Sequence, residues 1–171
     1  KLNPGKIFYD NLIMGTYLME AARLAGVEKF LGIGSATEYP KDASIPLKED
    51  DLWSGYPEEI NAPYSLAKKM LLVQGQAYRQ QYGFNAIHLL LTNVFGPGMN
   101  LENGYVISSL IQKIESATKG NEKFIELWGT GKPTRDFLYI EDAAEAVLLA
   151  VEKYDKAGPV NIGSGQETSI K

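Results

Sequence analysis

The sequence predicts an α/β fold with a mostly parallel sheet and helices on both of its faces. Segments with helical and with strand periodicity alternate along the chain, one strand-like run is apolar throughout, and glycines close several of the segments. A strand that is apolar on both sides is typical of a parallel sheet covered on both faces. Strands that alternate with helices favour parallel pairing, because each helix carries the chain back to start the next strand.

The first part of the chain contains one helix and one strand. Apolar residues at helical spacing predict a helix over residues 6–25, and Gly26 is a natural stop for it. Residues 29–34 have the composition of a short buried strand, which ends at Ser35. The stretch 40–63 is rich in turn formers and is predicted to be irregular.

A second helix and the fully apolar strand follow. Residues 65–82 carry apolar side chains in helical register, and Gly83 closes this helix. Residues 86–91 are apolar except for His88, the sole histidine of the chain. We interpret His88 as a core or edge histidine rather than as a functional one.

The remainder of the chain continues the alternation of helices and strands. We predict in order a helix, a strand, a short strand, a helix and a closing strand over residues 105–118, 124–128, 137–140, 141–153 and 159–163.

The composition is that of an ordinary globular domain. A length of 171 residues, a hydrophobic fraction of 44% and a charged fraction of 22% fit one domain of usual size. The net charge of −4 disfavours nucleic acid and anionic membrane as partners, and no apolar run approaches the ~20 residues that span a bilayer. With no cysteine and one histidine, we expect no metal site, and we expect a reducing, cytoplasmic setting.

Tyr64 and Lys68 form the most informative motif. They lie four residues apart at the start of a predicted helix, so that one helical turn puts both side chains on the same face. A phenol titrates near ~10, and lowering that value to ~7 takes roughly 4 kcal/mol, part of which a neighbouring ammonium supplies. Such a pair can exchange a proton with a substrate hydroxyl while a hydride moves at the same carbon. On spacing alone, an exposed helix pair without a function is the favoured interpretation, so the context of the motif decides.

Two glycine-rich segments lack the requirements of phosphate-binding loops. Residues 32–37 begin like a dinucleotide-binding G-x-G-x-x-G, but the residues up to Pro40 are no helix start. Residues 129–134 place Pro133 where a magnesium-binding Ser or Thr belongs. The chain therefore contains no pyrophosphate fingerprint of its own.

Four motifs occur in a fixed order along the chain. They are GSATEYP, NAPYSLAK, TNVFGP and WGTGKPTRDF, at residues 34–40, 61–68, 92–97 and 128–137. Together they resemble the extended short-chain dehydrogenase/reductase family, which comprises nucleotide-sugar epimerases, dehydratases and reductases. The resemblance covers essentially the whole chain, and it implies NADP or NAD as cofactor and a nucleotide-diphosphate sugar as substrate.

The resemblance implies a role for each of several residues. Tyr64 would be the general acid/base at the sugar C4 oxygen, Lys68 would bind the nicotinamide ribose, and Ser35 would donate a hydrogen bond to the reacting oxygen. These three residues would also contact the cofactor. The positions that match substrate-binding residues of the family are Asn61, Asn93, Lys113, Trp128 and Arg135.

Two of these assignments have alternatives in the sequence itself. Trp128 is equally suited to a hydrophobic core. Arg135 has acidic neighbours, Asp136 and Glu141, with which it could form an ion pair.

Two substitutions separate the chain from the family members that it resembles most. Those members epimerise C3 and C5 of a GDP-linked hexose with a cysteine and a histidine before they reduce C4, and the matching positions here are Thr37 and Tyr105. We keep both as candidate catalytic positions. A threonine hydroxyl is too weak an acid to exchange protons unaided with a carbon beside a ketone. The Ser35-Ala36-Thr37 run instead resembles 4-epimerases, which act at C4 alone.

The resemblance also implies the domain organisation. Family members begin with a glycine-rich half that binds the adenosine and pyrophosphate of the cofactor, and this chain matches the rear part. The implied fold is the rear part of a Rossmann-type parallel sheet, over 1–98 and 137–163. Part of a small substrate-binding domain would occupy 99–136 and 164–171.

The sequence thus predicts a nucleotide-sugar oxidoreductase or epimerase that acts at C4 of an NDP-hexose with NADP or NAD. One alternative is the 3,5-epimerase/4-reductase activity described above. The other is a truncated, non-catalytic remnant that dimerises, because helices 6–25 and 65–82 match the helices of a dimer interface in relatives. We expect a homodimer in either case.

Overall fold

The structure, a computed structural model, describes residues 3–101, 105–127 and 129–170. Contacts between α-carbons divide the chain into two compact units. The first unit comprises Lys1–Thr92 and Ala144–Ile162, and the second comprises Asn93–Ala143 and Gly163–Lys171. The assignment of such units to cofactor and substrate binding stays a prediction.

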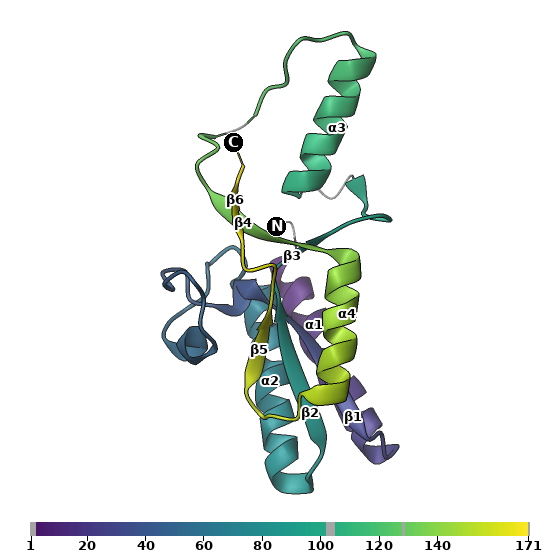
Figure 1. Cartoon of the computed structure of the whole chain (residues 1–171). Helices are drawn as coiled ribbons and strands as arrows, with labels where there is room; N and C mark the ends of the chain where they lie inside the picture. Colours follow the sequence, from purple (N-terminus) through teal and green to yellow (C-terminus); the bar gives the residue numbers. More distant parts are fainter. Residues whose placement is uncertain (1–2, 102–104, 128, 171) are drawn as a thin grey trace. The chain divides into compact units, whose positions relative to one another are not determined.

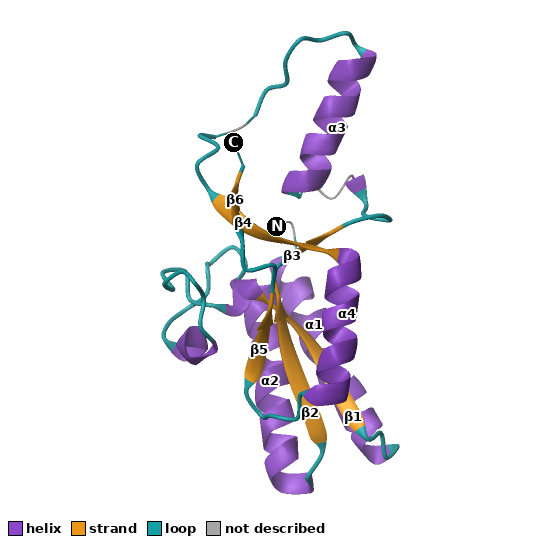
Figure 2. Cartoon of the chain, in the orientation of Figure 1, coloured by secondary structure: helices purple, strands orange, loops and turns teal. Residues whose placement is uncertain are grey.

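A three-stranded parallel sheet lies at the centre of the first unit (Figure 2). Its strands are β1 (Lys29–Ser35), β2 (Asn85–Leu91) and β5 (Pro159–Ile162), in the order β1-β2-β5. Ser35 pairs with Leu91, so β1 and β2 end level with each other. The predicted parallel sheet and its buried central strand are confirmed.

Helices cover both faces of this sheet (Figure 1). α1 (Pro4–Leu24) and α2 (Ala62–Tyr82) pack on one face, and the first-unit part of α4 (Ile140–Lys153) packs on the other. The α1/α2 face buries Met19, Ala22, Phe30, Leu71, Tyr78, Phe84 and Ala86. The α4 face buries Ile87, Leu89, Val147, Ala150, Val160 and Ile162. Alternate residues of β2 thus point to opposite faces, as the pleat of a strand requires.

The second predicted helix begins three residues earlier than its periodicity indicated. α2 starts at Ala62, and Pro63 occupies its first turn, where the missing N–H costs no intrahelical hydrogen bond. Gly83 closes the helix in the left-handed region with φ 65°. The Tyr64/Lys68 motif therefore lies in the first two turns of the helix.

The irregular stretch before α2 is tied to the first unit by buried side chains. It contains two short 3₁₀ turns, η1 (Ala36–Glu38) and η2 (Glu49–Trp53). Leu52 packs with Tyr39, Leu72 and Leu90 in one cluster. The buried Lys69 side chain of α2 donates to the Leu52 carbonyl at 2.6 Å.

The second unit contains the helix α3 (Val106–Lys119) and a sheet in the order β3-β4-β6. β3 (Asn93–Phe95) runs parallel to β4 (Thr134–Tyr139), and β6 (Glu167–Ser169) runs antiparallel to it. β3 and β6 were not predicted, because three residues are too few to show a periodicity.

The predicted strand at 124–128 is wrong for the residues described. Residues 124–127 form no strand, and residue 128 lies outside the described residues. Phe124 is 83% exposed, so this apolar run has no sheet face to cover. Apolar composition predicts a strand only where a neighbouring strand offers hydrogen bonds.

Within the described ranges, no helix combines the length and the apolar character that crossing a bilayer requires.

Candidate active site

Tyr64 and Lys68 face each other on α2, as the spacing predicts. The Lys68 Nζ lies 5.7 Å from the centroid of the Tyr64 ring, and both side chains are half-buried. Burial lowers the pKa of the Lys68 ammonium, and the negative charge of Glu38 opposes that shift. At this distance the ammonium interacts with the face of the tyrosine ring.

Three hydroxyl groups connect the end of β1 to the start of α2. The buried Ser65 donates from its Oγ to Thr37 Oγ1 at 3.1 Å, and Thr37 Oγ1 donates to Ser35 Oγ at 3.0 Å. Ser35 Oγ also accepts from the Thr37 N–H at 3.2 Å. Because Ser35 Oγ accepts twice, its own proton remains available to donate outward.

The turn that follows Ser35 is fixed by a reciprocal pair of hydrogen bonds. The Ser35 side chain caps η1, and Glu38 Oε1 accepts from the Ser35 N–H at 2.8 Å. This is a capping box, in which the side chain of the first residue and the side chain of the fourth each accept a hydrogen bond from the backbone N–H of the other. The Ser-x-x-Glu signature is visible in the sequence, so this positioning of Ser35 was open to prediction and was missed.

Asn61 occupies the N-cap position of α2, three residues before Tyr64. Its side-chain Nδ2 donates to Glu58 Oε2 at 2.8 Å. The structure therefore places Ser35, Thr37, Asn61, Tyr64 and Lys68 in the first unit, on η1, on the end of β1 and at the start of α2.

The other candidates lie in the second unit. Asn93 Nδ2 donates to the Asp136 carbonyl at 3.0 Å, Lys113 Nζ donates to the Glu126 carbonyl at 2.5 Å, and Arg135 Nη1 donates to the Thr134 carbonyl at 2.7 Å. Tyr105 is exposed at the N-cap of α3. Trp128 lies outside the described residues.

Asp136, one of the two carboxylates with which Arg135 could pair, accepts hydrogen bonds from backbone N–H groups. The Asp136 carboxylate accepts from the Ser164 N–H at 3.0 Å and from the Gly165 N–H at 3.0 Å. These amides hold the carboxylate on the turn before β6. Among the described residues, no group of three or more His, Cys, Asp or Glu side chains could hold a metal ion.

The chain belongs to the NAD-dependent epimerase/dehydratase family, whose model matches residues 1–163. This family comprises the epimerases, dehydratases and reductases that the four motifs indicate, so the resemblance is confirmed.

Curated relatives match nearly the whole chain. A GDP-L-fucose synthase from Sinorhizobium fredii is 40% identical over 169 residues, which are 98% of this chain and 54% of the relative. The GDP-L-fucose synthase of Escherichia coli is 31% identical over 98% of this chain and 56% of its own length. The chain thus spans about half the length of the curated relatives that it matches.

Solved structures share the fold. A GDP-D-glycero-L-gluco-heptose synthase from Campylobacter jejuni, determined with NADPH, has a TM-score of 0.88 and 26% identity, and covers 99% of this chain and 62% of its own. A GDP-L-fucose synthetase from Naegleria fowleri bound to NADP has a TM-score of 0.87 and 29% identity, over 98% and 56% of the two chains. The predicted Rossmann-type fold class is confirmed.

Proposed function

We propose that this chain carries the catalytic residues of a nucleotide-sugar oxidoreductase or epimerase that acts at C4 of an NDP-hexose. The observation that carries the proposal is the Tyr64/Lys68 pair at 5.7 Å on α2, with Ser35 at the end of β1. The family membership and the names of the relatives support a GDP-linked sugar as the first substrate to test.

The residues at this edge of the sheet fit the nicotinamide end of NADP or NAD. Ser35 and Leu91 end the two strands at one level, and the carboxyl ends of parallel strands are where such sheets bind ligands. The half-buried Lys68 ammonium suits the ribose hydroxyls beside that edge. The solved relatives with NADP or NADPH support NADP as the first cofactor to test, with NAD as the alternative.

The cofactor, when bound, supplies or accepts the hydride at C4. In the reductive direction, the Tyr64 hydroxyl gives its proton to the C4 oxygen, so that the ketone becomes an alcohol and the tyrosine a phenolate. The Lys68 ammonium stabilises that phenolate, and solvent returns the proton. Ser35 donates its free hydroxyl proton to the same oxygen and stabilises the charge that develops there.

Turnover of a fusion protein that contains this chain tests this function. We would place the N-terminal half of the Sinorhizobium fredii relative before this chain and measure NADPH-dependent reduction of a GDP-4-keto-hexose. Tyr64→Phe should lower kcat roughly 100-fold or more, because the general acid is lost. Unchanged turnover in Tyr64→Phe would show that another group transfers the proton.

A full GDP-L-fucose synthase activity is the second candidate, because the curated relatives carry that name. It requires proton exchange at C3 and C5. Thr37 Oγ1 already accepts from Ser65 and donates to Ser35, which supports a role in holding the turn rather than in exchange at carbon. We therefore expect no deuterium at C3 or C5 when the sugar is incubated in D₂O. Incorporation at either carbon would support the second candidate instead.

A non-catalytic remnant is the rival from another class. Titration of the isolated chain with NADPH separates the two. We expect weak binding, because this chain has no phosphate-cradling loop. Saturable binding at micromolar concentration would argue against an inert remnant. A homodimer through α1 and α2, and a cytoplasmic location, are further parts of this proposal.

A further inference from the structure

Glu38 and His88 form a buried pair beneath the turn that carries Ser35. Glu38 is 0% exposed and His88 is 3% exposed. The His88 Nε2 lies 3.3 Å from Glu38 Oε2 and 3.4 Å from Oε1. The prediction of a core position for His88 is therefore confirmed. Packing in a core does not require a carboxylate beside the histidine, and burying a carboxylate costs desolvation free energy. The presence of Glu38 beside His88 therefore calls for an explanation.

The backbone of β1 makes room for this pair. A Cβ on Gly34 would overlap His88 Nε2 and would lie 2.5 Å from Glu38 Oε1, and a Cβ on Gly32 would lie 3.0 Å from His88 Nδ1. The two glycines that start like a dinucleotide fingerprint thus have another purpose. Because neither glycine has a side chain, β1 can pass directly over the Glu38 carboxylate and the His88 imidazole.

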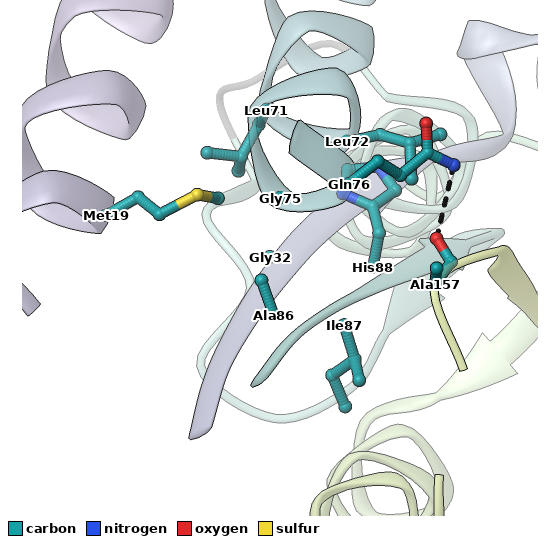
Figure 3. A pocket seen from close by; sticks show the side chains of 10 residues that line it. All are labelled: Met19, Gly32, Leu71, Leu72, Gly75, Gln76, Ala86, Ile87, His88 and Ala157. Carbon is teal, nitrogen blue, oxygen red and sulfur yellow. Dashed lines mark hydrogen bonds between the residues drawn. The ribbon is translucent and has the colours of Figure 1, made fainter. Parts of the chain in front are cut away.

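The imidazole also borders a small cavity between the sheet and α2 (Figure 3). The cavity measures about 10 Å³ and is lined by Gly32, Leu72, Gly75 and Gln76 as well as by His88. His88 Nδ1 is buried and has no hydrogen-bond partner among the described residues. Nε2 faces the carboxylate, and a lone pair at Nδ1 costs less to leave unpaired than an N–H, so this geometry favours the tautomer that is protonated at Nε2.

Four further groups compensate the buried charge of Glu38 or respond to it. The Ser35 N–H donates to Glu38 Oε1 at 2.8 Å. α2 packs against η1, which carries Glu38, and Ser65 on this helix donates to Thr37 on η1 at 3.1 Å. The ammonium groups of Lys68 and Lys69 on α2 are both attracted by the Glu38 charge. Tyr39, the next residue, also senses that charge. Among the described residues, Tyr64 is the last titratable group near this site, and the centroid of its ring lies 5.7 Å from the Lys68 Nζ.

We propose that Glu38, oriented by His88, is a positioning residue of the C4 reaction, which fixes the Ser35 amide and holds the Lys68 ammonium by its charge. The effect of Glu38 on catalysis rests on the proposed function, whereas the effect of Glu38 on the titration of Lys68 does not. Neither residue touches the substrate. Each acts through a residue that does.

The sole histidine makes the first measurement unambiguous. A long-range proton–nitrogen NMR spectrum of this chain contains one imidazole, and we expect the tautomer protonated at Nε2. In Glu38→Gln the histidine signals and the Ser35 amide signal should shift. An imidazole protonated at Nδ1 in the wild-type chain would overturn the proposal.

The second measurement follows the titration of the Lys68 side chain by NMR, with Lys68→Met to assign its signal. Glu38→Gln should move the midpoint to lower pH, because the charge that favours the ammonium is removed. His88→Asn keeps that charge and should leave the midpoint in place. Glu49→Gln is the matched control, since Glu49 Oε1 also accepts a backbone N–H at 2.8 Å, from Asn161. An unchanged midpoint in Glu38→Gln would overturn the proposal.

Should Glu38→Gln fail to fold, the double variant Glu38→Met/His88→Leu provides the same test. It replaces both buried partners by apolar groups, a change that proteins often tolerate. The midpoint of Lys68 should again fall.

Activity gives the third measurement, in the fusion with the N-terminal half of the Sinorhizobium fredii relative. Glu38→Gln should lower kcat roughly 10- to 100-fold with little change in KM for the sugar, because Ser35 and Lys68 are misplaced or uncharged. Unchanged kcat would overturn the catalytic consequence. If Lys68 responds to Glu38 but no sugar is reduced even by the wild-type protein, the proposed function fails while the electrostatic inference stands.

Discussion

At the scale of single residues, the candidate catalytic residue Ser35 is held by side chains on two elements. Ser35 receives hydrogen bonds through its hydroxyl from Thr37 and gives one through its amide to Glu38. Ser65 lies beside Tyr64 and completes the chain of hydroxyls. In the proposed function, these hydrogen bonds direct the proton that Ser35 donates to the substrate.

Ser65→Ala tests this direction. Loss of the buried hydroxyl should cost about 1 kcal/mol of unfolding free energy, because Thr37 Oγ1 loses a donor. Ser108→Ala is the control, since Ser108 is equally buried and donates to the Tyr105 carbonyl at 2.8 Å. Denaturant unfolding of the chain should show similar losses in both. In the fusion with the N-terminal half of the relative, only Ser65→Ala should also lower kcat. Equal kcat values in the two variants would contradict a role for the Ser65–Thr37–Ser35 hydrogen bonds in the reaction.

Tyr39 gives the stability of the chain a predicted pH dependence. Burial, together with the nearby carboxylates, raises the pKa of Tyr39 from its ordinary value of 10.0 to about 12, and the hydrogen bond from its hydroxyl to Asn161 opposes this shift. The folded state then binds more protons than the unfolded state between these values. The stabilisation is fully present below pH 10 and is lost as the pH rises through about 12.

Unfolding of Tyr39→Phe at alkaline pH measures this contribution. The wild-type chain should lose up to roughly 3 kcal/mol over that interval from this group, and the variant should lose less. Tyr56→Phe, at an exposed tyrosine, is the control. Parallel losses in Tyr39→Phe and wild type would rule out Tyr39 as the source.

At the scale of elements, strand β1 combines two tasks. Its central residues pair with β2, and its last residue is the candidate catalytic Ser35. Gly32 and Gly34 leave space on one face for Glu38 and His88. A sequence pattern for a buried strand would accept a larger residue at either position, and only the tertiary contacts show why glycine stands there.

Gly34→Ala should destabilise the chain by on the order of 3 kcal/mol, because its Cβ meets Glu38, His88 and the Leu89 carbonyl within 3.0 Å. Gly5→Ala is the control. Its Cβ meets nothing within 4 Å and it lies in a helix, so that change should be neutral or slightly stabilising. Thermal unfolding compares the two. Equal midpoints would show that the pair under β1 moves aside freely.

At the scale of the whole molecule, α1 and α2 leave apolar side chains in solvent although they cover one face of the sheet. Met14, Tyr17 and Leu18 are exposed on α1, as are Met70 and Val73 on α2. Exposed apolar side chains on two adjacent helices often mark an interaction surface, and here they support the homodimer that we propose through α1 and α2.

Tyr17→Glu should shift the proposed homodimer toward monomer. Tyr17 is 68% exposed, and a charge there would be buried in an interface between copies. Sedimentation velocity at several concentrations measures the change. Tyr56→Glu, at a residue 60% exposed in the irregular stretch, should leave the oligomeric state unchanged. Dissociation by both substitutions, or by neither, would contradict an interface on α1.

Local patterns determined most of the fold and part of the site. Helical periodicity located α1, α2, α3 and α4, and the apolar run located β2, because these signals repeat within a few residues. The four-residue spacing placed Tyr64 and Lys68 on one face for the same reason. The strand expected at 124–128 failed because strand formation depends on a neighbour that the segment itself does not contain.

Only the tertiary structure decided which residues contact the candidate catalytic ones. Ser65 and Thr37 are in contact although they lie 28 residues apart in the sequence, and His88 and Glu38 are in contact although they lie 50 residues apart. Contacts between positions so far apart leave no periodic signal in one sequence, because nothing local requires a histidine on β2 or a serine beside Tyr64. Local spacing in the sequence was enough to predict the Tyr64/Lys68 pair, whereas the Glu38 carboxylate and the Ser65 and Thr37 hydroxyls come together around Ser35 only in the folded chain.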